Sequence, residues 1–600
     1  MNKINTPSPQ QFDQNTLFDR LNAWVDAAPQ HPAQRFKQGS GWQNISTTEY
    51  RDRCFYLALF LESKGFRSGD VSAIFSYNCP QWAQMDLAPS LVGGLSAGIY
   101  PNSNQKDIQH ILSMTQAKVV CVQDKEYFQK LIGAKGEHPI PAHVEFLLVF
   151  NNDVSISPKA VAYEAAIAEG KRLAQGRSLK SYLDKMDPHA PGFLIFTSGT
   201  TGLPKGVMIS QNNMVCAADV VRKGWAFPKG GHELFSFLPL SHIAEKVHNL
   251  GVGICWQGTV NYCTKFDNLS LEIGEVNPTI LLAVPRLWEK MKEGVERKLS
   301  EAPAIRQNLA KWALKVGERV ARAKFAKKSP ALTDLLQYAV ADRLVLSKIR
   351  KALGFSRLKL GGSGAAPLAG SVVWWFRFLG VEIVELYGMT ETTAIIAFNY
   401  PGEEGSGTVG RPAPGIEFKL DTDGEICTRG RLIFKGYFKN DKATQEVMDS
   451  EGWLHTGDLG AIDERGYVRI IGRKRDILKT SGGKMLAPAP VEEKIKSCSY
   501  VGQVCVVGDN RKYFVAVVTL SEGAAAKGGT EAHKNEQIRS EIQKHFDAIN
   551  RELASYEQIK RFVVLERDFS IEKGEMTPTL KMKRNVIEQN FQDVIESLYS

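Results

Sequence analysis

A loop rich in hydroxyl groups and glycine is the part of this sequence best suited to chemistry. It runs from Thr197 to Gly206, after the apolar run 192–196 and before the apolar run 207–209, so we predict a strand on either side of it. Hydroxyl and backbone N–H groups donate hydrogen bonds, glycine lets the backbone close on a ligand, and Lys205 adds a compact positive charge. The loop is therefore predicted to hold an anion, most simply a polyphosphate. The alternative is a flexible surface turn.

A second group of chemically useful residues follows two further predicted strands. The segment 358–367 is typical of a strand that runs into a tight turn of small residues, and the strand that ends at Tyr387 opens on a polar turn. Small residues let an aromatic base approach the backbone, and Tyr387 offers a face for stacking. Thr390 and Glu391 supply oxygen atoms of the kind that Mg²⁺ prefers.

Three polar residues follow the strand predicted over 234–240. His242, Glu245 and His248 recur at helical spacing, which raises the hypothesis of a metal site. They lack the H-E-x-x-H order, and two histidines are few for a site of this kind. A substrate-side role for His242 at the strand end is favoured, and a structural histidine is the alternative.

These segments must be positioned by a fold in which strands alternate with helices. Over about residues 11–190 such alternation indicates layered α/β structure with a largely parallel sheet. A helix is predicted over 47–65, with Thr48 as its N-cap. From residue 424 onward short strands and turns indicate a small α+β domain, in which 522–535 is predicted to be a mobile loop.

Length and composition bound the class of protein. At 600 residues with 43% hydrophobic content, the chain is predicted to be globular with more than one domain. The sequence has no run of about 18 apolar residues and begins with a polar segment, so we expect neither a membrane span nor a signal peptide, and a cytoplasmic location. The nine cysteines include no C-x-x-C pair, which favours reduced thiols and no zinc site.

One segment carries the charge excess of the whole chain. From Arg286 to Lys351 there are 17 Lys and Arg against 7 Asp and Glu, and the full chain has a net charge of +10. This pattern indicates a basic amphipathic helix suited to an anionic membrane surface, with a solvated helical face as the alternative. No nucleic-acid-binding module is recognisable, so nucleic acid is not expected as a partner. The apolar residues of this helix are Trp312, Val316, Val320 and Phe325, and the basic residues near its end include Lys324, Lys327 and Lys328.

Taken together, the motifs and their order resemble the adenylate-forming, or AMP-binding, superfamily, which includes acyl-CoA synthetases, luciferases and nonribosomal adenylation domains. The resemblance covers about residues 30–595. The segments 238–242, 284–289 and 386–391 resemble the long-chain fatty acyl-CoA synthetase branch, including its bubblegum-type members. The long basic insert at about 289–357 fits the same branch.

The resemblance implies the fold class and the domains. We expect a large N-terminal adenylate-forming domain of layered α/β subdomains over 1–474, and a small mobile α+β C-terminal domain over 475–600. Arg475 stands at the hinge position. The small domain would swing about this hinge between two reaction steps, exchanging Lys581 for the turn that carries Lys484, where CoA would arrive.

The resemblance also implies a two-step reaction. A fatty acid carboxylate attacks the α-phosphate of ATP to give acyl-AMP and pyrophosphate, and the thiol of CoA then displaces AMP. Lys581 matches the family lysine that bridges the carboxylate and the α-phosphate and neutralises charge in the transition state. Leu580 precedes it where the family often has glycine, and Lys583 is the rival by proximity.

The remaining site residues are implied by their match to family motifs. Glu391 and Arg473 are the further catalytic residues, with Thr197 and Glu391 as the contacts of Mg²⁺ and Arg473 near the ribose and the α-phosphate. Asp458 would accept the ribose hydroxyls, and His242 and Trp288 lie on the acyl side, with Trp288 as an aromatic gate of an apolar tunnel. The phosphates would be held by Thr197, Ser198, Gly199, Thr200, Thr201, Gly202 and Lys205. Adenine and its surroundings would be framed by Gly362, Ser363, Gly364, Ala365, Tyr387, Gly388 and Thr390.

Several alternatives stay open at this point. The protein could stop at fatty acyl-AMP and deliver the acyl group to a carrier protein, or it could activate another hydrophobic carboxylate. A luciferase-like oxygenase, a phosphate-binding ATPase or kinase, and a non-catalytic regulator are further hypotheses. The combination of loop, acid, arginine and terminal lysine favours the ligase.

Overall fold

The computed structural model describes residues 15–133, 136–197, 203–570, 572–577 and 582–600. Within it the chain forms two compact units. The small unit consists of Lys419–Cys427 and His455–Ser600, and the large unit holds the chain up to Phe418 together with Thr428–Leu454. Asp458 and Arg473 thus belong to the small unit, although they precede residue 475, where the second domain is predicted to begin.

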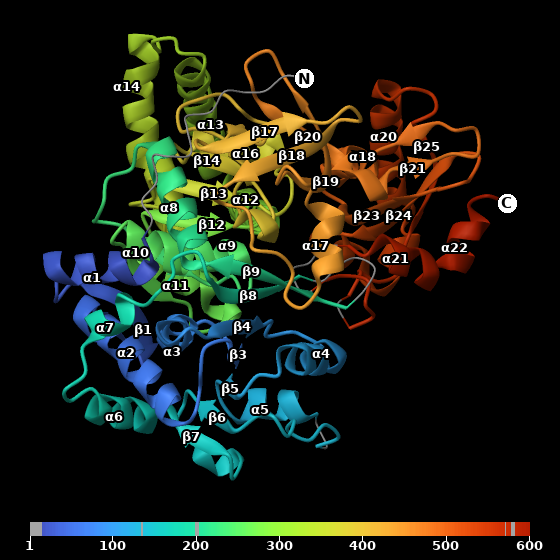
Figure 1. Ribbon diagram of the computed structural model, residues 1–600. Helices are drawn as coiled ribbons and strands as arrows, with labels where there is room; N and C mark the ends of the chain where they lie inside the picture. Colours follow the sequence, from blue (N-terminus) through green and yellow to red (C-terminus); the bar gives the residue numbers. More distant parts are fainter. Residues whose placement is uncertain (1–14, 134–135, 198–202, 571, 578–581) are drawn as a thin grey trace. The chain divides into compact units, whose positions relative to one another are not determined.

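The first sheet of the large unit has seven strands in the order β7-β6-β5-β3-β4-β8-β9. All its neighbours pair in parallel except β8 and β9, which are antiparallel. Strands β3 to β6 are buried along their whole length, as expected for parallel strands covered on both faces. In Figure 1 this sheet occupies the lower, mostly blue part of the ribbon. Its strands are β3 Val71–Phe75, β4 Leu95–Ile99, β5 Val119–Val122, β6 Phe146–Val149, β7 Ala160–Ala162, β8 Pro191–Thr197 and β9 Lys205–Ser210.

The second sheet of the large unit has nine strands in the order β16-β15-β14-β13-β12-β10-β11-β1-β2. Its six inner strands, from β14 across to β1, are parallel, and the edges are antiparallel. Two largely parallel sheets in one unit confirm the predicted α/β class. Its strands are β1 Pro32–Gln38, β2 Gly41–Ser46, β10 Glu233–Ser236, β11 Thr259–Tyr262, β12 Ile280–Ala283, β13 Leu360–Ser363, β14 Ile383–Tyr387, β15 Ala397–Phe398 and β16 Arg411–Pro412.

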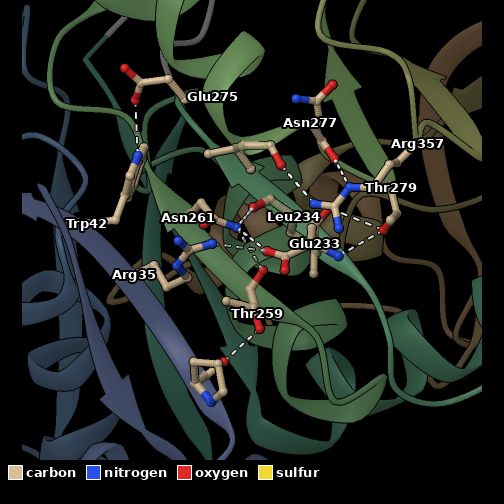
Figure 2. A network of polar contacts seen from close by, with 12 residues as sticks. Arg35, Trp42, Glu233, Leu234, Thr259, Asn261, Glu275, Asn277, Thr279 and Arg357 are labelled. Atoms are coloured by element: carbon tan, nitrogen blue, oxygen red, sulfur yellow. Dashed lines mark hydrogen bonds and ion pairs between the residues drawn. The ribbon is translucent and has the colours of Figure 1, made fainter.

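A polar network joins the strands of this sheet near their amino ends (Figure 2). The side-chain nitrogen of Asn261 on β11 donates to Glu233 Oε2 at 2.8 Å and to the carbonyl of Leu234 at 3.0 Å, both on β10. The backbone N–H of Glu233 donates to Thr279 Oγ1, just before β12, at 2.8 Å. The guanidinium of Arg35 on β1 lies 4.0 Å from the carboxylate of the same glutamate. These contacts fix the stagger of the strands at the edge opposite to their carboxyl ends.

Two local predictions need correction. The helix predicted over 47–65 forms as α2 Thr47–Ser63, but its N-cap is Ser46, whose hydroxyl accepts from the N–H of Glu49 at 3.1 Å. Thr48 lies inside the helix and donates to the carbonyl of Pro29 instead. The segment 522–535, predicted to be a mobile loop, forms α19 Glu522–Gly528 and a 3₁₀ helix over Gly529–Lys534. The hydroxyl of Ser521 accepts a hydrogen bond from the N–H of Ala524 at 3.2 Å, and this N-cap favours a helix in the alanine-rich stretch.

The basic insert of the large unit is helical. It comprises α12 Pro285–Ser300, α13 Ala304–Phe325, α14 Leu332–Ala341 and α15 Ser347–Ala352. The apolar face predicted to meet a membrane turns inward, because Val316 and Phe325 of α13 are buried. That face of α13 is thus a core face, so α13 is amphipathic as predicted but its apolar side packs on the protein, and the membrane contact of the insert stays a prediction. None of the helices in the described ranges is both long and apolar enough to cross a bilayer.

The small unit has α+β structure. Helices α18 Pro488–Lys496 and α20 Glu536–Glu552 pack against the three-stranded sheet β23-β24-β25, and α20 buries Ile538, Ile542, Phe546 and Ile549 at helical spacing. The strands that matter for the site are β19 Leu454–Ile462 and β20 Val468–Arg473, at one end of a four-stranded sheet that begins with β17 Ile416–Leu420 and β18 Glu425–Gly430. The hairpin sheet is β21 Leu478–Lys479 with β22 Met485–Leu486, and the three-stranded sheet is β23 Val501–Val507, β24 Phe514–Leu520 and β25 Ile559–Val564.

Candidate active site

Parallel strands of the nine-stranded sheet end side by side at the predicted nucleotide-binding turns. Ala283 of β12, Ser363 of β13 and Glu385 of β14 are direct neighbours across the sheet. The chain leaves β13 directly after Ser363 and leaves β14 after Tyr387. Ligands of open α/β sheets bind beyond the carboxyl ends of the strands, so this edge is the expected place for a site.

The backbone at this edge is packed too closely for side chains. A Cβ atom on Gly388 would lie 2.2 Å from the carbonyl oxygen of Ala394, and one on Gly364 would lie 3.2 Å from that of Leu386. Ser363 is buried, and its hydroxyl has no hydrogen-bond partner among the described residues. A buried hydroxyl without a partner is costly unless a ligand satisfies it. This edge therefore suits a flat ligand with polar atoms.

Glu391, Tyr437 and Lys205 form the central polar group of the large unit. The hydroxyl of Tyr437 donates to Glu391 Oε1 at 2.6 Å, and both side chains are buried. The ammonium nitrogen of Lys205 lies 5.0 Å from the centre of the Tyr437 ring, a cation–π contact. The structure thus brings the loop lysine and the predicted acid together through an aromatic residue. Tyr437 carries no motif or periodic signal in the sequence, and sequence reasoning missed it.

The base of the hydroxyl-rich loop is well defined. Thr197 and Lys205 are paired residues of the β8–β9 hairpin, which confirms the predicted strand on either side. The carbonyl of Pro204 is in hydrogen-bond contact with the ring nitrogen of His110 at 3.0 Å. The predicted phosphate contacts Ser198, Gly199, Thr200, Thr201 and Gly202 lie outside the described residues.

The turn that carries Glu391 holds an unusual backbone conformation. Glu391 lies in the short 3₁₀ helix Thr390–Thr392, and the next two residues, Thr393 and Ala394, both have positive φ angles of 51° and 70°. Residues other than glycine pay about 1–3 kcal/mol for such conformations, and they cluster at functional sites. The hydroxyl of Thr393 donates to the carbonyl of Leu432 at 2.8 Å, and this bond holds the strained turn in place.

The residues at this turn fit a magnesium ion. Tyr437 donates to Oε1 of Glu391, which leaves Oε2 without a donor among the described residues. Strand β9, whose first residue pairs with Thr197, contacts the 3₁₀ helix of Glu391. A carboxylate and a hydroxyl near a phosphate-binding loop are the oxygen ligands that Mg²⁺ takes together with substrate phosphates.

His242 begins the short helix α9 Ile243–Lys246, where its Nδ1 accepts from the N–H of Ala244 at 3.2 Å. Its ring lies 6.4 Å from that of Tyr100. Glu245 turns into the core and accepts from Ser236 at 2.5 Å, and burial raises its pKa well above the ordinary value. Burial also lowers the pKa of His248 to about 4. In the part of the chain that the structure describes, these three residues do not form a metal-ligand group.

Trp288 lies in the core. It is fully buried and packs against Phe355 and Phe376, with ring centres 5.9 and 5.3 Å away. A Cβ atom on Gly361 of β13 would lie 2.8 Å from the Trp288 ring. The tryptophan thus supports the strand that leads to the predicted nucleotide-binding turn, and its role as an acyl gate stays a prediction.

The small unit brings together the two predicted ribose and phosphate residues. Asp458 of β19 and Arg473 of β20 are directly opposite one another, and Arg473 Nε lies 2.9 Å from Asp458 Oδ1. Asp458 is buried, whereas Arg473 is 38% exposed. Next to them the N–H of Gly457 donates to Glu425 Oε1 at 2.8 Å, and Lys474 contacts the other carboxylate oxygen at 3.0 Å. The buried side chain of Glu425 therefore anchors the turn before Asp458.

The remaining predicted residues of the small unit are more exposed. Arg475 lies in the 3₁₀ helix Lys474–Asp476, and its guanidinium lies 3.8 Å from Asp476. Lys484 closes the β21–β22 turn, and its ammonium lies 5.4 Å from the centre of the Tyr556 ring. Lys581 lies outside the described residues, and the hinge and CoA roles stay predictions.

The chain next to Lys581 is anchored by a buried carboxylate. The backbone N–H of Lys583 donates to the carbonyl of Glu575 at 2.7 Å. The side chain of Glu575 is fully buried and accepts from Arg567 and Asn590 and from the N–H of Ser570. Burial raises the pKa of Glu575, but these hydrogen bonds outweigh it and lower the pKa to about 2.

One cluster of potential metal ligands was not predicted from the sequence. Ligand atoms of Asp421, Cys427 and His455 lie within 4.8 Å of one another in the small unit. Cys427 Sγ is already in contact with His455 Nδ1 at 3.4 Å, and the same ring nitrogen lies 3.5 Å from Glu425. These contacts engage Cys427 and His455 with one another and with Glu425.

Solved structures of other proteins share the fold of this chain. The adenylation domain of a carboxylate reductase from Mycobacterium chelonae matches with a TM-score of 0.71 and 23% identity, covering 99% of this chain and 93% of that chain. The ATP-bound MatB of Rhodopseudomonas palustris matches with a TM-score of 0.68 and 22% identity, covering 96% of this chain and 99% of that chain. At these identities the likeness shows the fold alone, which is that of adenylate-forming enzymes.

Comparison of the sequence then defines the family. The model of the AMP-binding enzyme family matches residues 21–438, and that of the AMP-binding enzyme C-terminal domain matches residues 475–600. The chain belongs to the AMP-binding enzyme family. It is 31% identical to the long-chain-fatty-acid–CoA ligase ACSBG1 of Rattus norvegicus over 94% of this chain and 83% of that protein. It is likewise 31% identical to the long-chain-fatty-acid–CoA ligase FadD15 of Mycobacterium bovis over 93% of each chain.

Proposed function

We propose that this protein is a long-chain fatty acid–CoA ligase that forms AMP. The group of Lys205, Tyr437 and Glu391 carries the proposal, because it places a cation and a buried carboxylate at the base of a loop rich in phosphate-binding groups. The glycine-lined strand ends of β13 and β14 supply a flat site for the base of the nucleotide. The names of the curated relatives support a long-chain fatty acid as the substrate and CoA as the acceptor.

In the first step the fatty acid carboxylate attacks the α-phosphorus of ATP, and the bond to the bridging oxygen breaks. Pyrophosphate leaves and acyl-AMP forms. Lys205 offers positive charge to the leaving phosphates. Arg473, oriented by Asp458 at 2.9 Å, and Lys581 offer positive charge near the α-phosphate. Such charges act where negative charge develops in the transition state.

Glu391 and Thr197 would hold Mg²⁺, which when bound neutralises the charge of the pyrophosphate that leaves. In the second step the sulfur of CoA attacks the acyl carbonyl carbon, the thiol proton passes to solvent, and AMP departs with the bonding electron pair. We assign the approach of CoA to the turn of Lys484, with Arg475 as the hinge. The protein is proposed to be cytoplasmic, with peripheral contact to the inner face of the membrane through the basic insert.

An ATP–pyrophosphate exchange assay over fatty acids of graded chain length tests the proposal. We expect exchange that requires a fatty acid and is strongest with long chains, together with CoA-dependent release of AMP. Exchange without thioester formation would identify a fatty acyl-AMP ligase that serves a carrier protein. Absence of exchange with every fatty acid would refute the ligase.

A further inference from the structure

Helix α14 presents a ridge of apolar side chains to solvent. The five members lie three, four, eight and twelve residues after the first, which places them on one face of the helix and its continuation. Each is between 43% and 73% exposed. We call this set the apolar ridge; its members are Leu332, Leu335, Leu336, Val340 and Leu344.

The opposite face of α14 is firmly docked. Arg319 of α13 donates to Asp334 and to Gln337 of α14, both at 2.8 Å. Ala341 is buried in the same core cluster as Val316 of α13 and Trp288. Figure 1 shows α14 beside α13 at the edge of the large unit, with its outer side uncovered. The orientation of the ridge is therefore set by packing, and it does not result from a frayed helix.

Basic residues flank the ridge at both ends. Lys327 and Lys328 precede α14, and Arg343, Lys348 and Lys351 follow it. All five are exposed and form no ion pair among the residues that the structure describes. The acids here are engaged, since Asp334 pairs with Arg319 and Asp342 with Arg350 at 2.7 Å. An apolar stripe between basic ends matches the boundary between lipid headgroups and acyl chains.

We propose that the apolar ridge of α14 inserts into an anionic lipid bilayer, while the flanking lysines and arginines contact its phosphate headgroups. A second copy of the chain fits less well, because two segments of net positive charge would repel each other. A bilayer also holds dissolved fatty acid and would bring the proposed substrate to the enzyme. This last point rests on the proposed function. Helices α13 and α14 bury side chains in the same core cluster as β12 and Trp288. The docked face of α14 therefore belongs to the core that supports the strands of the candidate site.

Sedimentation with vesicles tests the proposal on the full-length protein. Vesicles of phosphatidylcholine with phosphatidylglycerol are compared with vesicles of phosphatidylcholine alone. We expect the wild type to bind the anionic vesicles and L332E/L336E to bind about tenfold more weakly. We expect K327Q/K328Q to bind roughly thirtyfold more weakly at low salt. The matched control is F266E/L271E, which places two acids at positions 60% and 63% exposed on other helices of the same unit and is expected to bind like the wild type.

Wild-type binding that L332E/L336E leaves unchanged, or that F266E/L271E reduces equally, would overturn the proposal, as would failure of the wild type to bind. Light scattering without lipid adds a further test, because a dimer that L332E/L336E dissociates would identify a second copy as the occupant. ATP–pyrophosphate exchange over fatty acids of graded chain length, measured without vesicles, reports on the ligase separately. A protein that is inactive in exchange but still binds vesicles through the apolar ridge would refute the ligase function and support the membrane-binding surface.

Discussion

The hydroxyl of Tyr437 donates to Glu391 Oε1 at 2.6 Å, although the two residues lie 46 positions apart. The bond orients a buried carboxylate, and the ring of the same tyrosine faces the ammonium of Lys205 at 5.0 Å. One aromatic residue thus positions both the carboxylate that would hold Mg²⁺ and the lysine that would hold phosphate.

Tyr437→Phe removes only the hydroxyl and keeps the ring against Lys205. Hydrogen bonds to charged groups contribute about 1.5–3 kcal/mol, so we expect kcat for ATP–pyrophosphate exchange to fall about tenfold or more. We also expect the variant to need a higher Mg²⁺ concentration for half-maximal exchange. Tyr400→Phe, which removes another tyrosine hydroxyl of the same unit, is the matched control. An unchanged Mg²⁺ requirement in Tyr437→Phe would contradict the orienting role.

Asp458→Asn should weaken ATP binding. Arg473 Nε lies 2.9 Å from the buried Asp458 carboxylate. The amide keeps the shape but loses the charge that orients the arginine and that is proposed to attract the ribose hydroxyls. We expect the KM for ATP to rise by about tenfold or more, with a smaller effect on the KM for the fatty acid. Asp463→Asn, which breaks the exposed pair with Arg465 at 2.8 Å at the turn between β19 and β20, is the matched control. Equal effects of the two variants would argue against a nucleotide site at Asp458.

Glu575 should make the stability of the protein depend on acid pH. Its pKa is lowered from 4.5 to about 2 in the folded protein, so the folded state binds fewer protons than the unfolded state between these values. The carboxylate therefore contributes up to about 3 kcal/mol above pH 4.5, and this contribution is lost as the pH falls toward 2. Glu575→Gln should lower the free energy of unfolding at pH 7 and remove that pH dependence, as followed by thermal unfolding. Glu566→Gln changes an exposed acid in the same segment and should do neither.

The buried pair of Asp86 and Lys246 should be costly to break but not to replace. Both side chains are fully buried in direct contact, and Ser96 also donates to Asp86. Asp86→Asn leaves the lysine charge without its partner, and we expect a loss of about 3–5 kcal/mol in the free energy of unfolding. The double variant D86L/K246M removes both charges and should recover most of that loss. A double variant as unstable as the single one would show that the pair itself stabilises the core.

Much of the scaffold could be predicted from local patterns. Strands such as Val71–Phe75 and Val119–Val122 are short apolar runs between turn residues, and the hairpin around the hydroxyl-rich loop follows from two such runs. Because parallel strands end at a common edge, the turns after Ser363 and Tyr387 could be placed at one site before any distance was known. The pairing of Asp458 with Arg473 is suggested only by their motifs.

By itself, then, the sequence determined the α/β class, the strand-end location of the site and the family, since these depend on local periodicity, turn chemistry and motif order. Only the tertiary structure decided which long-range partners meet and which helix faces are buried. Tyr437 reaches Glu391 through the packing of segments distant in the chain. Val316 of α13 turns inward, whereas Leu336 of α14 turns to solvent, although both are apolar residues at helical spacing. The physical reason is that a periodic pattern defines a face, while the neighbours of that face are set by the rest of the fold.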